Sequence, residues 1–120
     1  MRKLYVCSKD FGNGARLIGI LSENNGKYKF EYKLGGILHR RYLKIDEFPD
    51  LSKVYYDEEV RPFVERIVPE RDFAHIDGFL KAAGLKEYDE WEFLKYCGAY
   101  NMRQDAYLYE NLPEGTIRYD

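Results

Sequence analysis

The feature that most constrains the fold of this chain is a change in its hydrophobic periodicity near residue 58. Before that point apolar and polar residues tend to alternate, as in strands; after it, apolar residues recur every three to four positions, as in helices. A run of strands followed by a run of helices is typical of an α+β domain. We therefore predict a small antiparallel sheet with three helices packed on one face. At 120 residues the chain is expected to form a single domain, over residues 1–120.

The predicted sheet is built mainly from residues 2–9, 15–22 and 27–34. The second of these segments is apolar on both faces, which favours a central strand. The third alternates between aromatic residues such as Phe30 and charged ones, so one face should meet the core and the other should meet water. Asn25-Gly26, which separates the two segments, is a hairpin signal. The pattern also allows short strands at residues 53–56 and 106–110.

Three helices are predicted in the second half of the chain, over roughly residues 60–68, 72–84 and 89–98. Pro62 is expected in the first turn of the first helix, where its missing N–H is not needed. Asp72 is the predicted N-cap of the second helix and Gly84 its C-terminal residue. The third helix opens at Asp89, with Glu92 three residues later in a capping-box-like arrangement.

The apolar stripe of each predicted helix indicates which side chains should enter the core. These are Phe63, Val64 and Ile67 from the first helix, Phe73, Ile76, Phe79, Leu80 and Ala83 from the second, and Trp91, Leu94 and Cys97 from the third. Phe63 and Trp91 are large residues on such stripes, so we expect both to be core residues.

Composition and charge argue against several classes of protein. The net charge of −2, from 19 Lys and Arg against 21 Asp and Glu, lacks the basic excess of a nucleic-acid-binding domain. We predict no membrane contact, because no apolar run approaches the ~18 residues of a membrane span, and the first residues lack the apolar core of a signal peptide. Cys7 and Cys97 are far apart without metal-ligand spacing, which favours reduced, buried thiols in a cytoplasmic protein.

The sequence contains little of the chemistry that an enzyme needs. A kinase requires a phosphate-cradling glycine loop, a lysine for the phosphates, and Asp and Asn ligands for Mg²⁺, and these motifs do not occur. Asp10-Phe11-Gly12 spells the metal-binding triplet of protein kinases, but no catalytic loop precedes it, so a turn is favoured. His39 and His75 have no suitably spaced partners and are predicted to be surface residues. We predict no enzymatic activity, no catalytic residues, no metal site and no cofactor.

Three motifs follow one another along the chain. They are Phe30-Glu31-Tyr32 at a strand end, Val60-Arg61-Pro62-Phe63-Val64 with a following Ile67-Val68-Pro69, and Tyr88-Asp89-Glu90-Trp91-Glu92-Phe93-Leu94 after Gly84-Leu85. In this order they resemble the N-terminal subdomain of HipA-type kinase toxins. The resemblance covers roughly residues 15–112 and is weakest over 37–57, where the chain lacks the S-L-S-L-P-like segment usual in that family.

The resemblance implies a function without catalysis. In that family the subdomain is normally the front piece of a longer kinase, whereas this chain is expected to stand alone. By analogy it would be a component of a toxin–antitoxin system that binds and regulates a separately encoded HipA-like Ser/Thr kinase, with a helix-turn-helix antitoxin as a further implied partner. Two other classes stay open: a general protein-interaction module, encoded by a phage or mobile element, and a small enzyme with an unrecognised site.

The predicted partner-binding residues lie in the segment that departs most from a plain scaffold, residues 37–57. They are His39, Arg40, Arg41, Tyr42, Tyr55 and Tyr56. Loops on a rigid sheet commonly carry recognition, and Arg and Tyr are enriched at binding hot spots. In the alternative interpretation, Tyr42 and one of Tyr55 or Tyr56 close the sheet edge, and the contact moves to the acidic helix ends at Glu58, Glu59 and Glu90.

Overall fold

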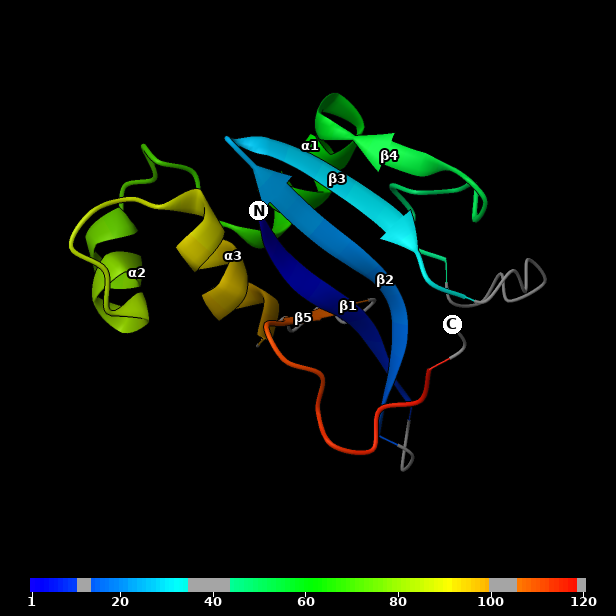
Figure 1. The fold of residues 1–120 in the computed structure, drawn as a ribbon. Helices are drawn as coiled ribbons and strands as arrows, with labels where there is room; N and C mark the ends of the chain where they lie inside the picture. Colours follow the sequence, from blue (N-terminus) through cyan, green and yellow to red (C-terminus); the bar gives the residue numbers. More distant parts are fainter. Residues whose placement is uncertain (11–13, 35–43, 100–105, 119–120) are drawn as a thin grey trace.

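A computed structural model describes residues 1–10, 14–34, 44–99 and 106–118 of the chain, and Figure 1 shows its fold. Within these ranges there are five strands and three helices. In chain order they are β1 (Arg2–Asp10), β2 (Gly14–Asn24), β3 (Lys27–Tyr32), β4 (Val54–Tyr56), α1 (Asp57–Ile67), α2 (Ile76–Ala83), α3 (Glu90–Ala99) and β5 (Tyr107–Tyr109). The predicted α+β class is confirmed.

The strands form one antiparallel sheet in the order β4-β3-β2-β1-β5. The strand with two apolar faces, β2, is central, as predicted. Asn25 and Gly26 form the β2–β3 turn with φ of 52° and 80°, the left-handed values that an Asn-Gly hairpin turn requires. The third strand ends at Tyr32, two residues earlier than expected, although Leu34 is still buried. The two short strands allowed by the pattern lie at the edges of the sheet.

An aromatic cluster fills the space between the sheet and α1. Phe30 of β3 stacks on Phe48 with ring centroids 4.3 Å apart, and Phe48 also lies 4.8 Å from Tyr55 and 5.3 Å from Phe63. All four residues are buried. Phe48, which belongs to no strand or helix, therefore lies at the centre of the core.

The first helix begins at Asp57, three residues earlier than predicted, so the placement of Pro62 in its first turn is wrong. Three consecutive carboxylates, Asp57 to Glu59, occupy the first turn, where the positive end of the helix dipole favours them. Pro62 therefore lies inside the helix and removes the N–H that would bond the carbonyl of Glu58. Both residues are exposed, so water can satisfy that carbonyl. Phe63 and Val64 are buried as expected, and Ile67 is half-buried.

The second helix differs most from its prediction. It starts at Ile76, with His75 rather than Asp72 as N-cap, and it ends as predicted at Gly84, whose φ of 72° is left-handed. It packs mainly against α3 instead of covering the sheet, and Figure 1 shows it at one end of the molecule. Phe73 and Phe79 were predicted to be core residues, but they are 42% and 39% exposed.

The third helix matches its prediction closely. The backbone N–H of Glu92 donates to Asp89 Oδ1 over 3.2 Å, so Asp89 caps the helix start. Trp91 and Leu94 are buried, and Cys97 is half-buried. The helix packs against β5, where Gly98 closely approaches the side chain of Leu108.

A second, smaller cluster lies apart from the main core. It contains Cys7, Ala15 and Leu17, with Leu112 of the C-terminal segment packed against it. The segment is held in place by backbone hydrogen bonds that join Ile117 to Ala15 and Leu17 over 2.9 Å each. Burial raises the pKa of the Cys7 thiol to about 11, so this predicted buried thiol is protonated and weakly nucleophilic at neutral pH.

Candidate partner-binding site

The residues predicted to bind a partner differ in their exposure to solvent, and some lie outside the described ranges. His39 to Tyr42 lie outside the described residues, and their part of the prediction stays a prediction. Tyr55 is 3% exposed, and its hydroxyl donates to the Asp50 carbonyl over 3.1 Å and accepts the Asp50 N–H over 2.7 Å. The neighbouring Tyr56 is 60% exposed. Tyr55 thus closes the sheet edge at β4, and Tyr56 is the described member that a partner can reach.

The acidic helix ends are the alternative contact surface, and some of their carboxylates already form hydrogen bonds within the domain. Glu90 Oε1 accepts hydrogen bonds from the Tyr28 hydroxyl over 2.7 Å and from Arg61 Nη1 over 3.0 Å. Burial, followed by this carboxylate, raises the pKa of Tyr28. Asp57 Oδ1 accepts the Tyr28 N–H over 3.1 Å. These contacts tie α1 and α3 to the β2–β3 hairpin, so Glu90 has a structural role. Glu58 and Glu59 are both exposed, and Glu59 forms an ion pair with Lys53.

A second polar group supports the same hairpin. The buried Glu23 accepts the Gly26 N–H over 2.8 Å and the Arg2 Nε–H over 2.6 Å. The guanidinium of Arg2 also lies 5.0 Å from the ring centroid of Trp91. The Gly26 N–H, with help from Arg2, holds the pKa of Glu23 below its ordinary value. The carboxylate is therefore stabilised in its charged form in the folded state.

Stability should depend on the ionisation of Glu23 in a predictable direction. The pKa of Glu23 is lower in the folded state than in the unfolded state. The stabilisation that Glu23 provides is therefore fully present above its unfolded pKa of ~4.3, and it is lost as the pH falls through its folded-state pKa. We expect Glu23→Gln to lower the free energy of unfolding by about 1–2 kcal/mol at pH 7. Urea titrations at pH 7 and pH 3 would test this. The difference between the two proteins should shrink at pH 3, and a constant difference would contradict the assignment.

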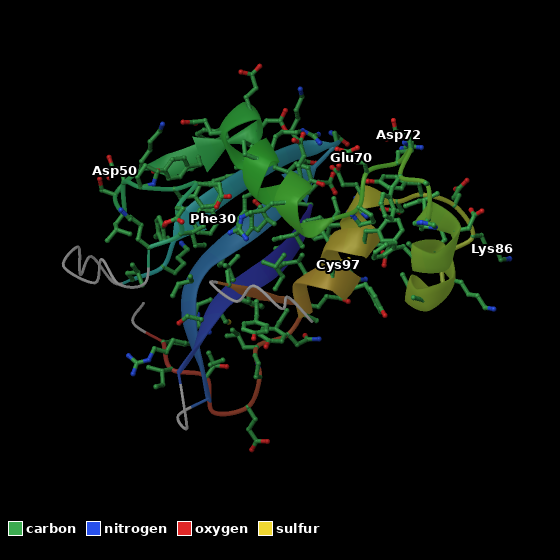
Figure 2. All side chains as sticks on the ribbon, turned by 180° about the vertical axis from the view of Figure 1, so that it is seen from behind. Phe30, Asp50, Glu70, Asp72, Lys86 and Cys97 are labelled. Carbon is green, nitrogen blue, oxygen red and sulfur yellow. The ribbon has the colours of Figure 1, made fainter. Side chains whose placement is uncertain are left out.

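A cleft of about 530 Å³ opens where the end of α1 meets the start of α3. Its lining consists of Arg61, Glu65, Val68, Pro69, Glu70, Arg71, Asp72, Tyr88 and Glu90. Arg71 lies over the ring of Tyr88 with its guanidinium carbon 4.5 Å from the centroid, and the Tyr88 hydroxyl donates to the Pro69 carbonyl over 2.8 Å. Figure 2 labels Glu70 and Asp72, on the segment that leads from α1 toward α2.

Beside this cleft an apolar surface is open to solvent. We call it the α2 face and define it by Phe73, His75, Gly78, Phe79 and Ala82. The Phe73 ring lies 5.6 Å from that of His75 and 5.8 Å from that of Phe79. A hollow of about 270 Å³ is lined by the other four members of the face. Aromatic rings that contact one another in solvent are a common feature of protein interaction sites.

The search for a metal site covers only the residues that the structure describes. No group of three or more His, Cys, Asp or Glu side chains within the described ranges could hold a metal ion. His75 is exposed, as predicted, and packs on Phe73. Of the Asp10-Phe11-Gly12 triplet, Phe11 and Gly12 lie outside the described residues. In the part of the chain that the structure describes, no helix has the length and apolar character to cross a membrane.

Comparison with protein families gives a match over most of the chain. The model of the HipA N-terminal domain matches residues 13–102. The chain belongs to the HipA N-terminal domain family. The match confirms the family predicted from the three motifs, and it is to the N-terminal domain, not to a kinase catalytic domain. HipA N-terminal domains are associated with HipA toxin–antitoxin systems. No curated protein and no solved structure matches the chain significantly.

In this HipA N-terminal domain the cleft and the α2 face are features that the sequence analysis did not identify. A signal for the α2 face was present in the sequence. His75, Phe79 and Ala82 are spaced i, i+4, i+7, and so are the half-buried Ile76, Leu80 and Ala83. Two adjacent apolar stripes exceed what one packing contact can bury. The cleft had no comparable signal, because it arises where residues 61–72 meet residues 88–90.

Proposed function

We propose that this HipA N-terminal domain is a non-catalytic component of a HipA toxin–antitoxin system that binds and regulates a separately encoded HipA-like Ser/Thr kinase. The observation that carries the proposal is the family match over residues 13–102. The exposed apolar α2 face supports it, because a surface of this kind favours a binding role.

The architecture suits a binding role in a second way. The hydrogen bonds of Tyr28, Glu90 and Arg61 hold the hairpin, α1 and α3 together. Such a scaffold presents a surface that needs little ordering when a partner binds, which reduces the entropic cost of association. The bound domain would regulate the kinase by occupying one of its surfaces, with no chemical step of its own.

Co-expression with its genetic neighbours tests the proposal. The domain would carry an affinity tag, and the proteins encoded on either side of its gene would be expressed without one. We expect a HipA-like kinase to co-purify with the domain and its phosphoryl-transfer rate to change on binding. A purified domain that hydrolyses ATP alone would contradict the proposal, as would a neighbouring HipA-like kinase that does not bind. Capture of a protein unrelated to kinases would favour the general interaction module.

A further inference from the structure

The second helix is less supported by its surroundings than α1 and α3. None of its eight residues, all within the described part of the chain, is buried. Ile76, Leu80 and Ala83 pack partly against the core, and the remaining stripe carries the α2 face. Isolated helices much shorter than ~12 residues are marginal in water, so a helix of this length depends on packing. Only one of its two apolar stripes therefore packs against the rest of the domain.

The α2 face also has room for an incoming side chain. A methyl group added at Gly78 would meet no atom within 4 Å. The hollow beside it, about 270 Å³, is many times the ~30 Å³ that one water molecule occupies. Phe79 and the adjoining Phe73 supply aromatic area next to this hollow. The geometry fits an apolar side chain that enters between Phe79 and Ala82.

Negative charge lies beside the α2 face. Asp72, which lines the cleft, directly precedes Phe73, and Glu65 and Glu70 line the same cleft. These three carboxylates have no ion-pair partner among the described residues. Asp77 adds a further exposed carboxylate on α2. The nearby cations are Arg61, which pairs with Glu90 in the same cleft, Arg71, placed over Tyr88, and Lys81 in the last turn of α2. The surface beside the α2 face is therefore acidic on balance.

We propose that the kinase docks on the α2 face, through a segment in which an apolar side chain stands beside basic ones. This inference rests on the proposed function and names the surface that serves it. The apolar side chain enters the hollow between Phe79 and Ala82. The basic side chains meet the acidic rim, which we define as Glu65, Glu70 and Asp72. Burial of the apolar contact supplies affinity, and the charge complementarity supplies orientation and association rate.

A second copy of this chain is a poorer occupant than the kinase. Two copies that paired through α2 would bring two acidic rims toward each other, and like charges across an interface are unfavourable. The face comprises five residues, whereas a stable interface usually involves roughly 20–30 residues on each side. A kinase, in contrast, can extend its contact from the α2 face across the cleft.

Calorimetry with the purified full chain and the HipA-like kinase tests this surface. We expect Phe79→Ser to weaken binding roughly tenfold or more, because it removes an exposed ring at the centre of the contact. Ala82→Lys serves as a second variant, since it keeps a good helix former and places a positive charge in the hollow. Thermal unfolding establishes that each variant is folded. Sedimentation of the wild-type chain alone is expected to show a monomer.

The acidic rim calls for a separate variant with a matched control. Glu70→Gln with Asp72→Asn should slow association and reduce its salt dependence, because the rim steers a basic segment. Glu114→Gln removes an exposed carboxylate from the C-terminal segment and should leave binding unchanged. Full affinity in folded Phe79→Ser and Ala82→Lys proteins would overturn the inference and leave the proposed function intact. Loss of binding in Tyr56→Ser instead would favour the surface predicted from the sequence. Failure of the wild-type chain to bind the kinase would overturn both.

Discussion

Replacing Phe63 with alanine is expected to lower the free energy of unfolding by about 3–5 kcal/mol. Phe63 is fully buried. The centroid of its ring lies 5.3 Å from the centroid of the Phe48 ring and 5.0 Å from the guanidinium carbon of Arg66. Removal of the ring leaves a cavity between α1 and the aromatic cluster, which the rigid sheet beneath cannot close. A domain of this size has a total stability of ~5–15 kcal/mol, so the variant would retain little of it.

Urea unfolding followed by circular dichroism measures this loss, and Phe73→Ala provides the matched control. It makes the same chemical change at a ring that is 42% exposed, so we expect a change of about 1 kcal/mol or less. Trp91→Ala should resemble Phe63→Ala, since Trp91 is 4% exposed and stacks on Tyr28. A Phe63→Ala protein that melts within a few degrees of the wild type would contradict the position of this ring in the core.

Much of the fold could be predicted because burial follows from local patterns in this sheet. Strand β3 alternates, and a period of two residues fixes which face of a strand is apolar. The Asn25-Gly26 turn fixes the pairing of β2 with β3, since few residues besides Asn and Gly accept both positive φ values. Asp89 and Glu92 marked the start of α3 for an equally local reason, a backbone N–H that needs an acceptor.

The parts that could not be predicted depend on contacts between distant segments. The periodicity of α2 shows an apolar stripe, but not whether a neighbour exists to cover it. Because α2 packs on α3 rather than on the sheet, Phe79 remains at the surface. Phe48 lies in a segment without periodicity, so its burial could be recognised only from the ring contacts that it makes. Tyr55 and Tyr56 looked equivalent in sequence, and the pairing of β4 with β3 separates them.

The candidate site, too, depends on how distant segments pack and not on a local sequence pattern. The motifs around Phe30, Phe63 and Trp91 indicated the family, and all three residues are buried. These three buried rings stabilise the core, so a partner cannot contact them directly. The α2 face is a property of how the second helix is placed, which no single motif records.

Gly19→Ala is expected to destabilise the domain by about 3 kcal/mol, although it adds a single methyl group. A Cβ at this position would lie 2.5–2.6 Å from two carbons of the Phe30 ring and 2.7 Å from the Glu31 carbonyl oxygen. The ring cannot move away, because it is fully buried and stacks on Phe48 at 4.3 Å. The carbonyl belongs to the backbone of β3, which pairs with β2 at this point. Relief therefore requires a shift of two paired strands or a new conformation for a core ring.

Gly78→Ala is the matched control, because the same methyl group there meets no atom within 4 Å. Gly78 lies inside α2, where alanine is a better helix former by ~1 kcal/mol, so this variant should be as stable as the wild type or more stable. Gly19→Ala should thus lower the urea midpoint, whereas Gly78→Ala should leave it unchanged or raise it. Equal stability of Gly19→Ala and the wild type would contradict the close contact of β2 with Phe30, and with it the aromatic cluster that supports α1.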